Sequence, residues 1–148
     1  MSRVRDFVTN RLPVILYSFV GLGYLVQGVK YFSAAELMPY HMAVLETPWE
    51  SLGVEYQTLL LGLLKGFGAG AIGVGLAIIL MALFPLRAGS SWARWATPVV
   101  AALYTGALVY VTSFALLPGA TPIAVSATLH GFVIVAAVSS MFGGASKD

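Results

Sequence analysis

Long stretches without charged side chains constrain the fold of this chain more than any other feature. Residues 12–29, 66–86 and 95–146 contain no Asp, Glu, Lys or Arg. Only 9% of all residues are charged and 59% are hydrophobic, which gives a mean hydropathy of +0.88. Soluble domains carry about 25% charged residues, so this chain lacks the polar groups that a water-facing surface needs. We therefore expect an integral membrane protein.

Four membrane-spanning helices fit these stretches, because a helix needs about 20 mostly apolar residues to cross a bilayer. The Pro-Gly dipeptide at 118–119 ends the third helix, and Pro122 suits the first position of the fourth. The predicted fold class is an all-α, polytopic four-helix bundle, which forms one domain. The expected spans lie at about 13–32, 56–84, 95–117 and 122–142.

The distribution of cations predicts how the bundle is oriented. All but two of the Lys and Arg side chains fall on one side of the four spans, namely Arg3, Arg5, Arg11, Arg87, Arg94 and Lys147. The positive-inside rule makes this side cytoplasmic. Both termini are therefore expected in the cytoplasm, and the acidic connection between the first two spans is expected outside.

The first connection carries its own helix signals. Two segments fit the Ser/Thr-x-x-Glu capping box, one at 33–36 and one at 47–50. The first predicts a short interfacial helix from about Ala34 to Leu45, which Pro39 shortens or kinks. The second predicts a helix that begins at Pro48 and runs directly into the second span. This connection is interpreted either as a solvated interfacial cap or as a lid over a site between the helices.

Lys65 is the most unusual residue of the second span. A Lys near mid-membrane costs roughly 2.5–3.5 kcal/mol on insertion scales, so such residues commonly face protein or water and serve a function. Small residues on one helical face, which let helices approach in lipid, predict a helix-helix seam formed by Gly62, Gly66, Ala69 and Gly73. Lys65 borders this seam and is expected to face the bundle, with snorkelling to the outer interface as the alternative.

Polar residues within the spans are concentrated in the half nearer the acidic connection. Lys65 and His130 are expected at similar depths, about 10–15 Å below the outer surface. Alternatively, His130 is a neutral core histidine that bonds to a neighbouring helix. The candidate ligand-binding residues are Lys65, His130, Gln27, Thr112 and Ser126, and the candidate lid residues are Glu36, His41, Glu46, Glu50 and Glu55.

Several kinds of chemistry find no support in the sequence. There is no cysteine, which excludes disulfides and thiolate chemistry. His41 and His130 are the only histidines, and no metal-ligand spacing links them to a carboxylate, so we predict no metal site. No basic patch for nucleic acid is present, and the sequence indicates no particular cofactor.

Two motifs resemble those of a known family. The first span reads Gly21-Leu-Gly-Tyr-Leu-Val-Gln-Gly28-Val-Lys30, and the second contains Gly66-Phe-Gly-Ala-Gly-Ala-Ile-Gly73. Together they resemble the first half of DoxX-like membrane proteins. The resemblance implies a four-helix protein of the bacterial inner membrane, with Glu55 as the acidic residue that opens the second helix. Some members are subunits of quinone-linked redox complexes, whereas Lys65 matches no position of the family pattern.

The expected function is that of a small integral membrane protein that binds an amphipathic ligand in an outward-facing polar pocket. A lipid, fatty acid or quinone would suit the site, because a polar head group and an apolar tail match its surroundings. The chain is alternatively a subunit of a membrane complex or a homo-oligomer. A third interpretation is an enzyme acting on a lipid or isoprenoid, with His130 and a loop glutamate as acid and base. A fourth is a scaffold that packs through its glycine seams.

Overall fold

The computed structural model describes residues 2–45, 47–114 and 121–142 of the chain. Within these ranges all regular structure is helical, so the all-α prediction is confirmed. The elements are α1 (Ser2–Asp6), η1 (Phe7–Arg11), α2 (Leu12–Phe32), α3 (Pro39–Leu45), η2 (Trp49–Ser51), α4 (Val54–Met81), η3 (Ala82–Leu86), α5 (Ala93–Phe114) and α6 (Thr121–Phe142).

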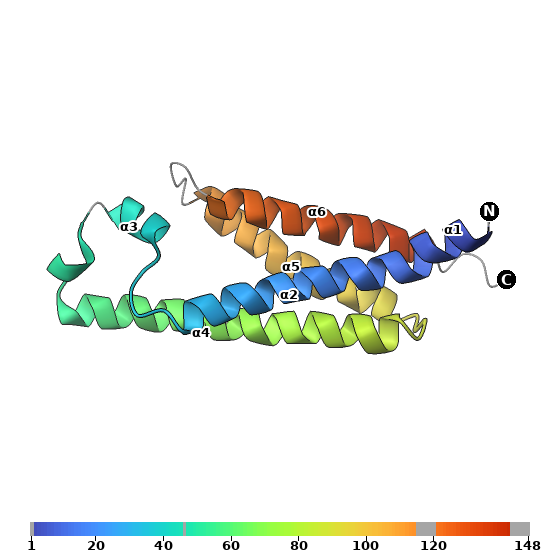
Figure 1. Ribbon diagram of the computed structural model, residues 1–148, viewed down its shortest axis with the longest axis horizontal. Helices are drawn as coiled ribbons and strands as arrows, with labels where there is room; N and C mark the ends of the chain where they lie inside the picture. The colour runs from blue at the N-terminus through green and yellow to red at the C-terminus, as the bar shows by residue number, and fades with distance from the viewer. Residues whose placement is uncertain (1, 46, 115–120, 143–148) are drawn as a thin grey trace.

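Four helical stretches are long and apolar enough to cross a membrane, as predicted: Arg3–Phe32, Val54–Leu86, Ala93–Ser113 and Ala124–Phe142. They lie along one another, with α1 and the last turns of α6 at one end and α3 with η2 at the other (Figure 1). We call these the terminal end and the loop end. This arrangement fits a multi-pass membrane protein whose two ends are built from different connections.

Two pairs of glycines bring the backbones of α2 and α4 together. Gly21 lies against Gly75, and Gly28 lies against Gly68. A Cβ built on any of the four would come within 2.6–2.7 Å of an atom of the other helix, closer than real Cβ atoms approach. In each helix the two glycines are seven residues apart, which is about two turns, so both face the partner. Small residues at such a contact are what allow helices to associate in lipid.

The predicted seam of α4 is wrong, because it lies on the opposite face of the helix. Gly62, Gly66, Ala69 and Gly73 are all exposed, and a Cβ on any of these three glycines meets nothing within 4 Å. At about 100° per residue, this face points roughly 170° away from the buried one. The buried face consists of Leu64, Gly68, Ala71, Gly75 and Ile78. Gly66 and Gly73 are also seven residues apart, so the spacing alone does not distinguish the two faces; the contacts with Gly21 and Gly28 do.

The other face of α2 packs against α6, and α6 packs against α5. Leu129 of α6 lies 3.2 Å from a Cβ built on Gly23. Helix α5 begins beside the end of α4 and crosses toward α6 at the loop end (Figure 1). The centre of the bundle combines aromatic, branched and small side chains, among them Tyr17, Val20, Tyr24, Ile78, Ala101, Val133 and Ala136.

A second hydrophobic cluster lies at the loop end. Tyr31 and Leu64 are buried there together with Ala34 and Leu37 from the segment that follows α2. Tyr40 of α3 and Trp49 of η2 pack against these residues. The connection between the first two spanning helices is therefore anchored by its own small core.

The structure corrects two details of this connection. The short helix occupies 39–45 rather than 34–45, because proline suits the first turn of a helix and Pro39 begins it here. No continuous helix runs from Pro48 into the second span. Leu52 and Gly53 adopt ψ values of 137° and 149°, which separate η2 from α4. The location of α3 at a membrane surface stays a prediction.

Candidate functional site

His130 is tied to a neighbouring helix at the middle of the bundle. Its Nδ1 lies 3.1 Å from the Thr105 hydroxyl oxygen. That hydroxyl donates its only proton to the carbonyl oxygen of Ala101, 2.7 Å away. The Thr105 oxygen must therefore accept from His130, which places a ring proton on Nδ1. In a neutral His130, Nε2 is then left as a hydrogen-bond acceptor.

Two tyrosines next to this pair have buried hydroxyl groups without partners. The rings of Tyr24 on α2 and Tyr104 on α5 meet edge to face, with centroids 4.8 Å apart. Both hydroxyl oxygens are inaccessible to solvent, and neither completes a hydrogen bond with a described residue, although the Tyr24 hydroxyl lies beside the Thr105 hydroxyl. A buried hydroxyl without a partner costs about 1–3 kcal/mol. Such groups are rare in native proteins, where buried polar atoms usually have a protein atom, a water molecule or a ligand atom as partner.

A row of aromatic rings connects this position to the loop end. Phe67 of α4 stacks on Tyr104 at a centroid distance of 6.2 Å, and it contacts Tyr31 at 5.6 Å. Tyr31 in turn contacts His41 of α3 at 6.0 Å. The row therefore includes residues from four helices. These rings contact one another in turn from the middle of the bundle to the cluster beneath α3.

Polar contacts at the end of the row hold α3 to α2. The Gln27 amide donates to the Tyr31 hydroxyl at 3.3 Å, and the hydroxyls of Tyr31 and Tyr40 are hydrogen-bonded to each other. Burial, followed by the contact with Tyr31, raises the pKa of Tyr40 above its ordinary value. Burial also lowers the pKa of His41, whose Nδ1 is buried without a hydrogen bond.

Lys65 does not face the bundle, contrary to the prediction. It is exposed on α4, between the buried face and the exposed glycine face. No hydrogen bond or ion pair joins it to any other described residue, so the structure does not bring Lys65 together with His130. The reason is the rotation of α4, which is set by the glycine contacts with α2.

The remaining predicted residues have separate surroundings. Thr112 is half-buried and donates to the carbonyl oxygen of Leu108 in its own helix, 2.8 Å away. Ser126 is buried in α6. The lid candidates Glu36, Glu50 and Glu55 are exposed, and Glu46 lies outside the described residues. Among the described residues, no three His, Cys, Asp or Glu side chains lie close enough to hold a metal ion.

The sequence does not predict the cavities that the structure has at the terminal end. A cavity of about 650 Å³ is lined by cationic side chains from three segments, including Arg11, Arg87 and Arg94. A neighbouring cavity of about 490 Å³ is lined by Arg3, Asp6, Phe7 and Arg11. The signal was present in the sequence, because these arginines were predicted to share one side of the membrane. In the sequence alone, they indicate only the orientation of the bundle.

No protein-family model, curated protein sequence or solved structure matches this chain. The resemblance to DoxX-like proteins therefore stays a prediction.

Proposed function

We propose that this protein is a multi-pass membrane protein that binds an amphipathic molecule, with the head group held between α2 and α5. The head group contains a carbonyl or carboxyl oxygen, as in a quinone, a fatty acid or another lipid. This proposal keeps the ligand class expected from the sequence. It moves the site from Lys65 to the tyrosine pair beside His130.

The observation that carries the proposal is the pair of unpartnered hydroxyls on Tyr24 and Tyr104. Each hydroxyl can donate one hydrogen bond, and an oxygen-bearing head group supplies the acceptors. The surrounding surface consists of aromatic and aliphatic side chains, which suit a ring or an acyl chain. Ligand sites in helical bundles commonly combine such apolar walls with a few polar groups.

Helices α4 and α5 diverge on one side of this site. They are adjacent at the terminal end and separate toward the loop end, where α5 approaches α6 (Figure 1). Phe67 and Tyr104 meet where the two helices separate. A ligand tail on this side extends along exposed apolar residues such as Leu63 of α4. Lys65 is exposed on the same helix but lies about 160° around it from Phe67, so it points away from this side.

The test compares three variants purified from the same membranes. Mass spectrometry of extracted amphipathic molecules is applied to wild type, to the double variant Tyr24→Phe/Tyr104→Phe and to Tyr17→Phe. Tyr17 is the matched control, because its hydroxyl is also buried without a partner but lies two turns away on the same face of α2. We expect the double variant to retain roughly 30-fold less ligand, since two hydrogen bonds contribute about 1 kcal/mol each.

The Tyr17→Phe protein should retain the ligand at the wild-type level. Equal retention by all three proteins would contradict the proposal. Stability gives an independent readout. In delipidated protein the double variant should be more stable than wild type, because two unpaired hydroxyls have been removed. A double variant that is less stable in the same state would mean that these hydroxyls are satisfied within the protein.

The proposed location is the bacterial inner membrane, with the terminal end in the cytoplasm. The support is the concentration of arginines at that end. The chain contains no cysteine, so single cysteines can be introduced without background. A membrane-impermeant maleimide added to intact cells stripped of their outer membrane should label Ser51→Cys at the loop end. It should leave Ser91→Cys unlabelled until the membrane is opened, and the reverse pattern would overturn the orientation.

A second candidate function is a packing subunit of a homo-oligomer or larger membrane complex. The observation that favours it is the exposed face of α4, where a Cβ built on Gly62, Gly66 or Gly73 would meet no atom of the described residues within 4 Å. Native mass spectrometry in a mild detergent measures the oligomeric state and so tests this function. An assembly that is lost in Gly66→Leu supports this function, and a wild-type protein that is monomeric throughout argues against it.

A further inference from the structure

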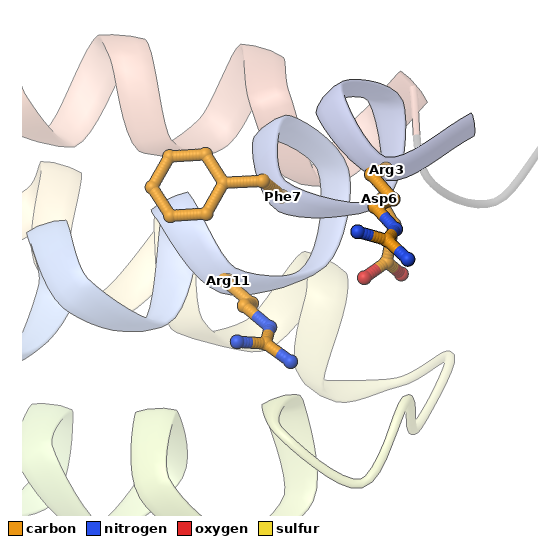
Figure 2. Close-up of a pocket in the computed structure, with 4 residues that line it drawn as sticks. All are labelled: Arg3, Asp6, Phe7 and Arg11. Atoms are coloured by element: carbon orange, nitrogen blue, oxygen red, sulfur yellow. The ribbon is translucent and has the colours of Figure 1, made fainter. Parts of the chain in front are cut away.

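The cavity at the terminal end is built from segments far apart in the sequence. Asn10 and Arg11 of η1 line it together with Arg87 and Gly89, which follow η3, and Arg94 in the first turn of α5. Figure 2 shows the neighbouring cavity, where Arg11 and Arg3 extend to one side of the N-terminal helix and the ring of Phe7 points away. Both cavities are lined by Asp6 and Arg11, so they adjoin at the N-terminal helix, and we call the two together the cationic region.

The positive charge of this region is not neutralised within the described part of the chain. Four arginines line the two cavities, whereas the carboxylate of Asp6 is the single acidic group among the lining residues. That carboxylate accepts a hydrogen bond from the Asn10 amide at 2.8 Å. No arginine forms an ion pair within 4 Å with a described carboxylate. The region therefore presents an excess of guanidinium groups to whatever enters it.

The backbone around the cavity departs from regular α-helix on two sides. Both η1 and η3 are π-helical, and such turns in helices are frequent at functional sites. Pro85 lies within η3, where it removes one backbone donor. Gly89 has a φ of +78°, which permits the tight turn that brings Arg87 and Arg94 to the same cavity.

The start of α5 adds a second argument for an anion. A helix N-terminus carries partial positive charge, so acidic residues are favoured in the first turn. The first turn of α5 contains no acidic residue, and it contains Arg94 instead. Arg94 is therefore placed where a cation is unfavourable. An anion bound in the cavity would compensate both the partial positive charge of the helix N-terminus and the charge of the Arg94 side chain.

Apolar side chains surround the cationic region on the side of the bundle. Val14 and Ile15 line the cavity below Arg11, and 46% of the Ile15 surface is exposed. Trp92 and Trp95 flank Arg94 with exposed fractions of 58% and 63%. Tryptophans are enriched at membrane interfaces, which places the cavity at head-group depth. A ligand here contacts guanidinium groups and hydrocarbon together.

We propose that this cavity binds the phosphodiester group of an anionic phospholipid, with its acyl chains along Val14 and Ile15. Arginine suits this role, because its planar guanidinium can donate two parallel hydrogen bonds to phosphate oxygens. The chemistry that the cavity recognises is a phosphate group. The adjacent apolar surface favours a lipid over a free phosphate ion. This site is distinct from the tyrosine site and does not depend on it.

The experiment titrates the delipidated full-length protein with phosphatidylglycerol or phosphatidylcholine of identical acyl chains, followed by native mass spectrometry. The variants are Arg11→Gln/Arg94→Gln, the charge-preserving Arg11→Lys/Arg94→Lys and the control Arg5→Gln. Arg5 is exposed and lines neither cavity. A separate arm adds millimolar inorganic phosphate to the protein that already carries phosphatidylglycerol.

We expect wild type and Arg5→Gln to prefer phosphatidylglycerol. The glutamine pair should weaken phosphatidylglycerol binding by roughly 25-fold, at about fivefold per arginine near an anionic head group, and leave phosphatidylcholine binding unchanged. The lysine pair keeps the charge and should lose only part of the preference. If the glutamine pair does not fold, the lysine pair tests the proposal. A lysine pair with an unaltered preference for phosphatidylglycerol would then contradict a role for the paired hydrogen bonds from arginine to phosphate.

Three results would overturn the proposal. The first is an unaltered preference in a folded glutamine pair. The second is an equal loss in Arg5→Gln, which would indicate general charge attraction. The third is displacement of phosphatidylglycerol by millimolar inorganic phosphate, which would assign the cavity to a free anion.

Discussion

The two ends of the bundle differ in the kind of polarity that they bury. The loop end contains uncharged groups, with Gln27, Tyr31 and Tyr40 joined by hydrogen bonds and His41 packed against them. The terminal end contains arginines around open cavities, with Asp6 as the single lining carboxylate. The loop end therefore pairs its tyrosine hydroxyls internally and leaves only Nδ1 of His41 without a described partner, whereas the terminal end leaves its charges available to a ligand.

The structure of both ends depends on the packing of α2 against α4. Helices α2 and α4 run through both ends and are held by reciprocal glycine contacts. The Gly28–Gly68 contact lies nearer the loop end and the Gly21–Gly75 contact nearer the terminal end. A change at either contact therefore tests whether the two ends fold as a unit.

The largest effect is expected for Gly68→Leu. Its side chain would collide with the backbone of α2, because a Cβ alone comes within 2.6 Å of the Phe32 nitrogen. We expect a loss of about 3 kcal/mol or more in the free energy of unfolding, at the upper end of overpacking effects. Chemical denaturation in detergent, followed by circular dichroism, measures this loss.

The matched control is Gly66→Leu, two residues away on the exposed face. A Cβ at Gly66 meets nothing within 4 Å, so the monomer should keep its stability within about 0.5 kcal/mol. If both leucine variants lost the same stability, the assignment of the buried face of α4 would be wrong. If Gly68→Leu disturbed the loop end alone, the two ends would be shown to fold independently.

A smaller effect is expected from acid at the loop end. Burial lowers the pKa of His41 below its ordinary value of 6.5, so the folded state disfavours the charged ring. As the pH falls below 6.5, the unfolded state takes up a proton that the folded state resists, and stability is lost. Above pH 6.5 the contribution is fully present.

We therefore expect α3 to loosen between about pH 6.5 and pH 5, a window on the acid side of the ordinary His pKa. The fluorescence of Trp49, which packs in the same cluster, reports this change when Trp92 and Trp95 are replaced by Phe. His41→Gln should abolish the pH dependence. If the pH dependence of the Trp49 fluorescence persisted in His41→Gln, another titratable group would be responsible for it.

The smallest effect is expected for Lys65→Met. Lys65 is exposed and forms no hydrogen bond or ion pair with any described residue, so its removal should leave the fold intact. Retention of the ligand at the tyrosine site should fall less than in Tyr24→Phe/Tyr104→Phe when both are measured by the same lipid extraction. A larger loss of ligand in Lys65→Met would mean that the ligand is bound at Lys65, as predicted from the sequence, and not at the tyrosine pair.

Hydropathy alone was sufficient to predict four apolar helices, because membrane insertion depends on the total apolarity of each segment. It was not sufficient to predict how each helix is rotated. The buried pair Gly68 and Gly75 and the exposed pair Gly66 and Gly73 are both seven residues apart, so the spacing of Gly21 and Gly28 fits either, and only the packing of the two helices distinguishes them. The prediction that Lys65 faces the bundle was wrong for the same reason, because it depended on the rotation of α4.

The tyrosine site was only partly predictable. His130 was identified as a polar residue of the bundle, and the structure adds its hydrogen bond to Thr105. The recurrence of Tyr17, Tyr24 and Tyr31 every seven residues was a usable signal, since it places all three on one face of α2. The contact with Tyr104 depends on the crossing of α2 and α5, which no local pattern encodes.

The difference between the two ends can be examined in one measurement, a mass-spectrometric profile of the lipids that co-purify with three proteins. These are wild type, Tyr24→Phe/Tyr104→Phe and Arg11→Gln/Arg94→Gln, expressed and purified in parallel. We predict a crossed pattern: the tyrosine variant loses a molecule with a carbonyl or carboxyl head group and keeps anionic phospholipid, while the arginine variant does the reverse. Loss of the same molecules from both variants, or from neither, would contradict the assignment of two separate sites.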